Sequence, residues 1–227
     1  MPLQESVVKV IAFSLWGDNP KYTIGAINNV KVAKKLFPDW TCRFYFGPDV
    51  PKYIIRTLCD LDAECSMMSE SGWNGMFWRF FAADSHDVVL SRDTDSRLGE
   101  REKSAVDDWL KSEKDFHIMR DHPYHDTSIL GGMWGVRNGL LKGIKDMIHG
   151  YDKKSFDDKY QVDQNFLREV IYPMVKDKSM VHDEFFENMP FPNNAPERTS
   201  VNFVGQVFNQ LDEPEFVSYS AAPSRGK

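Results

Sequence analysis

Apolar runs alternate with amphipathic stretches along the first half of the chain, which predicts alternating strands and helices. Residues 7–15 (VVKVIAFSL) are almost continuously apolar, as in a strand buried on both faces. Asn19 and Pro20 follow, and because Asn caps helices and Pro suits their first position, a helix is expected to about Leu36. The same reasoning predicts strands at 42–46, 63–68, 87–91 and 116–119, and helices at 51–59, 72–83, 101–112, 139–149 and 161–172.

This alternation predicts an α/β fold with a mostly parallel central sheet flanked by helices. Neither an internal repeat nor a Ser/Gly/Pro-rich linker divides the sequence, so we expect a single domain over residues 1–215, with 216–227 as a flexible tail. Ligands of such sheets bind beyond the carboxyl ends of the strands. Two of these ends carry suggestive residues, at 14–17 (SLWG) and at 92–95 (RDTD).

Composition narrows the classes of partner. The 227 residues include 34 Asp and Glu against 28 Lys and Arg, a net charge of −6, which argues against binding to nucleic acid through bulk charge. An anionic ligand would therefore have to be held locally, by a metal ion, an Arg or helix N-termini. No apolar window approaches the about 18 residues of a membrane span, no leader peptide is evident, and the odd count of three cysteines favours a reducing compartment. We expect a cytoplasmic protein.

Asp93 and Asp95 are the first candidate for chemistry. Residues two apart on an extended segment point to the same side, so both carboxylates can face one cation, and Mg²⁺ or Mn²⁺ prefers such oxygens. The pattern alone is weak, because Asp60-Leu61-Asp62 repeats it in what we interpret as a solvated loop. Arg79, on the preceding helix, has a guanidinium suited to a phosphate or a sugar hydroxyl, or else is a surface residue whose stem covers aromatic neighbours.

These residues also carry a family resemblance. The string at 76–98, MFWRFFAADSHDVVLSRDTDSRL, resembles the helix–strand–DxD passage of nucleotide-sugar-dependent glycosyltransferases with the Rossmann-like GT-A fold. LGGMWGVRN at 130–138 resembles their sugar-binding strand, and VDQNFL at 162–167 resembles a segment of retaining members. The resemblance covers about residues 7–205 and is closest to small enzymes of bacterial polysaccharide clusters and large DNA viruses.

The resemblance implies a metal-dependent enzyme that moves a hexose or deoxyhexose from a nucleotide-sugar, with UDP preferred, to a sugar hydroxyl of a glycan acceptor with retention. It implies Mn²⁺ or Mg²⁺ as cofactor, with Asp93, Asp95 and His182 as ligands. His182 is preferred over an alignment that places Asn202 there, since imidazole binds Mn²⁺ better than an amide. The implied sugar-nucleotide-binding residues are Ser14, Leu15, Trp16, Arg79, Asp93, Gly131, Gly132 and Gly205.

The same resemblance implies that Asp163 binds sugar hydroxyls and that Gln164 lies near the anomeric carbon. An inverting enzyme would instead need a carboxylate base, and Asp121 or Asp126 would serve. Simpler interpretations remain open: Gly131 and Gly132 would permit tight packing, and Asp163 would be an exposed helical charge.

Other motifs and functions compete with this reading. His122 and His125 have the spacing of zinc ligands but lack an evident third ligand, so an acceptor-binding, lid or solvated loop is favoured. A sugar nucleotidyltransferase would need a Gly-rich basic loop after the first strand, which FSLWGDNPK does not provide, and a HAD-type phosphatase would carry its Asp pair near the N-terminus. A carbohydrate-binding module would use the Trp and Tyr rings and need no metal.

Overall fold

The computed structural model describes residues 7–69, 72–151 and 161–215, which form one domain around a seven-stranded sheet. The predicted tail at 216–227 lies outside the described residues. The sheet has the order β3-β2-β1-β4-β6-β5-β7. Its strands are β1 (Lys9–Leu15), β2 (Thr41–Phe46), β3 (Glu64–Met67), β4 (Val88–Arg92), β5 (Phe116–Arg120), β6 (Met133–Arg137) and β7 (Ser179–Asp183).

The helices follow most of the predicted spans. Asn19 caps α1 as predicted, since its side chain accepts a hydrogen bond of 3.0 Å from the Lys21 N–H while Pro20 occupies the first helical position. The helical elements are α1 (Pro20–Leu36), α2 (Lys52–Asp60), the 3₁₀ helix η1 (Trp73–Asp84), α3 (Glu100–Lys111), α4 (Ile144–Gly150), α5 (Val162–Phe166), the π-helical η4 (Leu167–Ile171), α6 (Tyr172–Val175) and the 3₁₀ turn η5 (Lys176–Lys178).

The sheet is mostly parallel, as predicted, with β6 as the exception. β1 pairs in parallel with β2 and β4, β2 with β3, and β5 with β7, whereas β6 runs antiparallel to both of its neighbours. Because β6 is reversed, its first residue, Met133, lies opposite Arg92, the last residue of β4. The loop that leads into β6 therefore reaches the same sheet edge as the carboxyl ends of β1 and β4.

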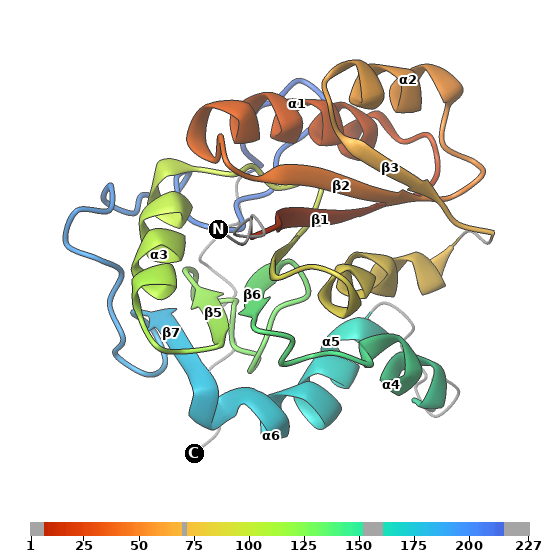
Figure 1. The fold of residues 1–227 in the computed structure, drawn as a ribbon. Helices are drawn as coiled ribbons and strands as arrows, with labels where there is room; N and C mark the ends of the chain where they lie inside the picture. Colours follow the sequence, from red (N-terminus) through yellow and green to blue (C-terminus); the bar gives the residue numbers. More distant parts are fainter. Residues whose placement is uncertain (1–6, 70–71, 152–160, 216–227) are drawn as a thin grey trace, which may run out of the picture.

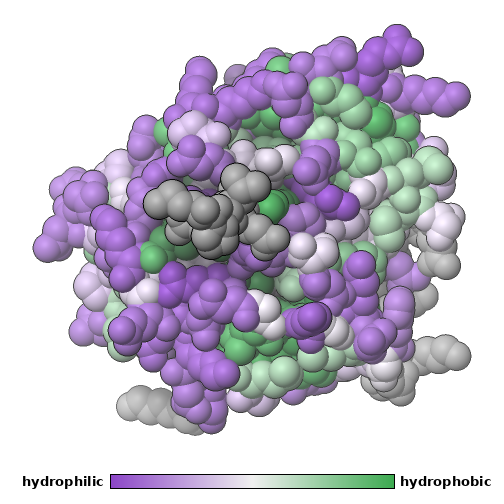
Figure 2. Space-filling model, in the orientation of Figure 1, coloured by the Kyte–Doolittle hydropathy of each residue, from purple (hydrophilic) through white to green (hydrophobic). Residues whose placement is uncertain are grey.

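Helices cover both faces of the sheet (Figure 1). β1 shows why, because its residues alternate between two hydrophobic clusters: Ile11 and Phe13 pack with α1, α2 and α3, while Val10 and Ala12 pack with η1, α4, α5 and η4. Outside these clusters the surface is largely hydrophilic in the view of Figure 2. Among the described residues no helix is long and apolar enough to cross a membrane.

Several elements differ from the predictions, and two of them carry predicted site residues. The segment at 72–83 was expected to be a helix with one apolar face, but η1 is a 3₁₀ helix with residues buried around it, including Trp78 and Arg79, because it lies between the sheet and α4. The strand β7 was not predicted at all. Its sequence, SMVHD, ends in two polar residues that are nevertheless buried, because His182 and Asp183 find polar partners in the interior.

A buried ion pair joins β4 to α3. The Arg92 guanidinium donates to the Glu102 carboxylate, and neither residue is more than 2% exposed. Arg92 also donates to the Gly132 carbonyl oxygen at 3.1 Å, so the pair supports the loop before β6. Burial raises the pKa of Glu102, and the charge of Arg92 opposes that shift.

We predict that Glu102→Gln lowers the free energy of unfolding by about 3–5 kcal/mol, because it leaves the buried Arg92 charge without its counter-charge. Urea unfolding followed by circular dichroism at pH 7.5 measures this loss.

Asp107→Asn is the matched control on the same helix. Asp107 pairs with Lys103 at 2.5 Å, but its side chain is 43% exposed, so we expect a loss below about 0.5 kcal/mol. Equal losses in the two variants would contradict the importance of the buried pair.

Candidate functional site

A cavity of about 530 Å³ opens beyond the carboxyl ends of β1 and β4, within the size range of small-molecule sites. The β1 end contributes Ser14, Leu15 and Trp16, and the β4 end contributes Asp93 and Asp95, as the position of these strand ends predicted. Its other lining residues are Gly17, Asp18, Asn19, Tyr22, Met76, Arg79, Thr94, His125, Leu130, Gly131, Met133, Asp163, Gln164, Gly205 and Val207.

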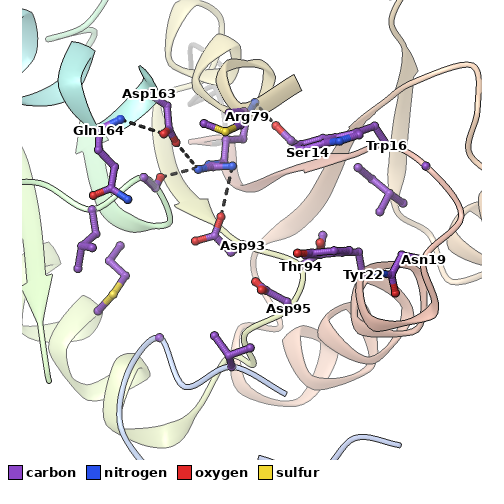
Figure 3. A pocket seen from close by; sticks show the side chains of 18 of the residues that line it. Ser14, Trp16, Asn19, Tyr22, Arg79, Asp93, Thr94, Asp95, Asp163 and Gln164 are labelled. Atoms are coloured by element: carbon purple, nitrogen blue, oxygen red, sulfur yellow. Dashed lines mark hydrogen bonds and ion pairs between the residues drawn. The ribbon is translucent and has the colours of Figure 1, made fainter. Parts of the chain in front are cut away.

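Arg79 joins four segments at the centre of this cavity (Figure 3). Its guanidinium forms ion pairs with Asp163 at 2.9 Å and with Asp93 at 3.3 Å, and its Nε donates to the Gly131 carbonyl oxygen at 3.2 Å. Its backbone N–H donates to Ser14 Oγ at 2.9 Å. The residue is only 5% exposed, so it is not the surface arginine that was the alternative interpretation. Asp163 is 4% exposed and likewise not an exposed helical charge.

The carboxylates make the cavity strongly acidic. Asp18, Asp93, Asp95 and Asp163 line it, with Arg79 as the one guanidinium among the described lining residues. Burial raises the pKa of Asp95 to about 6, and the negative charge of Asp93 adds to the shift. Burial likewise raises the pKa of Asp163 to about 6 against the opposing charge of Arg79. Such mutual repulsion is relieved by a cation placed between the carboxylates.

Two glycines let the loop before β6 approach these charges. A Cβ at Gly131 would lie 2.5 Å from both Arg79 Nη2 and Asp163 Oδ2, and a Cβ at Gly132 would overlap the Asp93 carboxylate. Gly132 is not itself among the lining residues; it lies behind Asp93. The close approach therefore serves the charged cluster rather than packing between the sheet and a helix.

Helix α1 holds the turn that contains Asp93 and Asp95. Gly25 packs directly on this turn, since a Cβ there would overlap the Thr94 carbonyl oxygen. The buried Asn29 side chain donates to the Ser96 carbonyl oxygen at 2.8 Å and accepts from the Leu98 N–H at 3.1 Å. These two positions of α1 fix where the Asp pair lies, and sequence reasoning did not single them out.

A segment near the C-terminus forms a further wall of the cavity. Val207 pairs with Ser96 in an isolated bridge, and the Phe208 N–H donates to the Asp95 carbonyl oxygen at 2.8 Å. Gly205 adopts a φ of +87°, in the left-handed region that favours glycine, and lines the cavity. The wall therefore lies beside the same turn that α1 supports from another direction.

Three further predicted site residues do not line the cavity. His182 and Asp121 are both absent from its lining, and Asp126 is an exposed residue outside it. Asp121 is completely buried and accepts two hydrogen bonds from Arg101, at 2.8 and 3.0 Å. A carboxylate held in this way anchors the protein and is poorly placed to act as a base.

His182 lies in a separate polar interior beneath α3. Its Nδ1 is 2.8 Å from His117 Nε2, and its Nε2 is 3.3 Å from a carboxylate oxygen of Asp108. Both ring nitrogens thus have protein partners. Because β7 pairs with β5 at the edge of the sheet, His182 lies opposite Met119 and not beside the Asp pair.

A divalent ion fits the two remaining carboxylates. Ions such as Mg²⁺ are commonly held by one or two carboxylates together with substrate phosphates rather than by a complete protein cage. Among the described residues no group of three His, Cys, Asp or Glu side chains forms such a cage.

The zinc hypothesis for His122 and His125 finds no support either, since the Nδ1 atoms of both rings accept hydrogen bonds from backbone N–H groups.

Sequence reasoning missed several lining residues, including two at one end of the cavity. Trp16 had been predicted, and Asn19 and Tyr22, at the start of α1, lie with it at this end (Figure 3). Their position directly after β1 was an available signal. Gln164 lies at the opposite end. The lining residues Met76, Leu130 and Met133 carry no chemical signature, and only the folded chain identifies them.

The chain matches no protein-family model, and no curated protein matches it in sequence.

Several solved structures share part of its chain arrangement. Glucosyl-3-phosphoglycerate synthase from Mycobacterium tuberculosis, in complex with UDP, matches with 14% identity and a TM-score of 0.48 over 78% of this chain and 69% of that chain. The same enzyme with Mn²⁺, UDP-glucose and glycerol 3-phosphate gives a TM-score of 0.47 at the same identity and coverage. A mannosyltransferase from Pyrobaculum calidifontis, with GDP-mannose and Mn²⁺, gives 10% identity and 0.49 over 82% and 57%.

We predict that Gly25→Ala destabilises the protein by about 1–3 kcal/mol, although Ala is normally the better helix residue by about 1 kcal/mol. The sign reverses because the added methyl group would overlap the Thr94 carbonyl oxygen. Urea unfolding at neutral pH measures the change.

Gly150→Ala is the control, because a Cβ at this last residue of α4 meets nothing within 4 Å. We expect it to be neutral or slightly stabilising. A Gly25→Ala protein as stable as the wild type would mean that α1 does not hold this turn closely.

Proposed function

We propose that the chain is a metal-dependent glycosyltransferase of the GT-A type. It moves a hexose or deoxyhexose from a nucleotide-sugar, a UDP-sugar in this proposal, to a sugar hydroxyl of a glycan acceptor. The observation that carries the proposal is the Asp93 and Asp95 pair, placed beside Arg79 between two chemically different ends of one cavity. A nucleotide-sugar needs such a site, with a cation for its diphosphate and separate surroundings for base and sugar.

Asp93 and Asp95 would hold Mn²⁺ or Mg²⁺, because their carboxylates supply the oxygen ligands that hard cations prefer. When bound, the ion supplies a positive charge that stabilises the negative charge of a departing diphosphate. Arg79 would orient the ligand beside it with a guanidinium that is already fixed by Asp163 and the Gly131 carbonyl. Because these partners fix the side chain before the ligand arrives, little ordering remains to be done on binding.

The two ends of the cavity suit the two parts of the sugar nucleotide. Trp16 and Tyr22 supply aromatic faces, and Asn19 supplies an amide, for a nucleobase. Gln164 lies at the opposite end, where the sugar would be transferred. In the proposed retaining reaction its side-chain carbonyl stabilises the cationic anomeric centre. Asp163 holds the backbone of Gln164, because its carboxylate accepts a hydrogen bond of 2.9 Å from the Gln164 backbone N–H.

Calorimetry with UDP, with and without Mn²⁺, tests the proposal. We expect Mn²⁺-dependent binding that Asp95→Asn weakens at least about 10-fold, because the variant removes one of two charges that hold the ion. Asp62→Asn is the matched control, since Asp60-Leu61-Asp62 repeats the spacing and the Asp62 side chain is 85% exposed beside Lys34. Metal-independent binding of free sugars, with no UDP binding, would favour a carbohydrate-binding module instead.

The stereochemistry gives a second test. Turnover of a UDP-sugar followed by proton NMR shows which anomer forms first, and we expect the configuration of the sugar nucleotide to be retained. Gln164→Ala should then lower kcat by about 10-fold or more with a smaller effect on KM, because its carbonyl acts on the developing charge. An inverted first product would remove this role from Gln164.

A further inference from the structure

We propose that His125 binds the ligand of this cavity as a neutral hydrogen-bond donor, through Nε2–H to an oxygen of the sugar diphosphate, and is not a metal ligand. The inference rests on the proposed function, because the proposed ligand supplies that oxygen. It gives a role to a lining residue in the loop between β5 and β6, a loop that contains neither the Asp pair nor Gln164.

The position of the imidazole proton follows from one hydrogen bond. The backbone N–H of Asp121 lies 3.0 Å from His125 Nδ1, and a backbone N–H can only donate. Nδ1 therefore presents its lone pair and carries no proton. A neutral imidazole in this state has its single proton on Nε2.

The ring stays neutral at physiological pH. Burial lowers the pKa of His125 to about 3, and the neighbouring His122 ring adds to the shift. A metal ligand needs a lone pair on the coordinating nitrogen, and in this tautomer Nε2 has none. The same geometry that makes Nε2 a donor thus removes it from the set of candidate ligands for the cation.

Nε2 is available to a ligand. His125 lines the cavity, next to Gly205, where a Cβ would lie 3.3 Å from the His125 Cε1 atom. In the described parts of the chain no group forms a hydrogen bond with His125 Nε2, and this atom is not fully buried. Because His125 lines the cavity, we infer that this accessible donor faces it.

The residue that holds this ring is itself held firmly. The Asp121 carboxylate accepts two hydrogen bonds from Arg101 and a third from the Val204 N–H at 2.9 Å. Val204 directly precedes Gly205 in the wall of the cavity. Asp121 thus contacts His125 through its backbone N–H and the adjacent wall through its side chain, so the hydrogen bond that sets the tautomer is itself anchored.

The charge of the cavity explains why a neutral donor is useful there. The Arg79 guanidinium is already shared among Asp93, Asp163 and the Gly131 carbonyl. Phosphate and hydroxyl oxygens of a ligand need further donors, and a buried cationic imidazole would be costly to maintain. A neutral Nε2–H supplies the donor without that cost.

Nitrogen-15 NMR of the imidazole rings tests the tautomer directly, because protonated and unprotonated ring nitrogens differ clearly in chemical shift. We expect Nε2 to be protonated in the free protein. Mg²⁺ alone should leave His125 unchanged, whereas UDP-glucose with Mg²⁺ should shift its Nε2–H. A proton on Nδ1, or a Mg²⁺-induced change of the kind that coordination of Nε2 produces, would overturn the proposal.

Variants test the contribution to binding. The side-chain amide of Gln can reach the position of Nε2, whereas that of Asn reaches only the position of Nδ1. We expect His125→Asn and His125→Phe to raise the Kd of UDP-glucose with Mn²⁺ about 10-fold or more, and His125→Gln to remain within about 3-fold of the wild type. The exposed His149 provides the control, His149→Gln, which should leave the Kd unchanged.

Comparison of UDP with UDP-glucose locates the contact. If the His125 variants bind both ligands more weakly, the hydrogen bond goes to a phosphate oxygen. If they bind only UDP-glucose more weakly, it goes to a sugar hydroxyl. Unchanged affinities in a folded His125→Phe protein, with the wild type binding normally, would overturn the role of His125 and leave the proposed function standing. A wild-type protein that binds neither ligand would instead overturn the proposed function and this inference with it.

Discussion

The buried guanidinium of Arg79 is the interaction on which the cavity depends. It lies between the Asp163 and Asp93 carboxylates, which would otherwise repel each other, and it also binds the Gly131 carbonyl oxygen. Through these bonds one residue of η1 fixes the end of β4, the loop before β6 and the start of α5 relative to one another. Each of these segments contributes to the cavity, so its shape follows from the satisfaction of a single buried charge.

A second layer of support surrounds this centre, and its residues take no part in the proposed chemistry. Asn29 and Gly25 of α1 hold the turn of the Asp pair, and the buried pair of Arg92 and Glu102 supports the loop before β6. The Asp121 carboxylate supports the wall that contains Gly205, because it accepts a hydrogen bond from the Val204 N–H. Rigid support of this kind keeps the acidic side chains together despite their repulsion, as the proposed cation site would require.

Local pattern was enough to predict most of the strands and helices, because the buried strands are continuous apolar runs and α1 carries its own cap. It also singled out Asp93, Asp95 and Arg79, which the structure brings to one cavity. It failed where position depends on distant partners. His182 looked like a metal ligand, but β7 was not predicted, and its pairing with β5 places that ring beside His117. Asp121 looked like a base because its partner, Arg101, lies on a different element.

The wall formed by Gly205 and Val207 has a consequence for how the protein is made. It joins the turn after β4 through Val207 and Phe208, across more than a hundred residues of sequence. All seven strands precede this wall in the chain, so a ribosome releases every strand before it releases the segment that closes the cavity. The sheet can therefore form during synthesis while the site is still open on one side, and the cavity gains this wall only after every strand has been released.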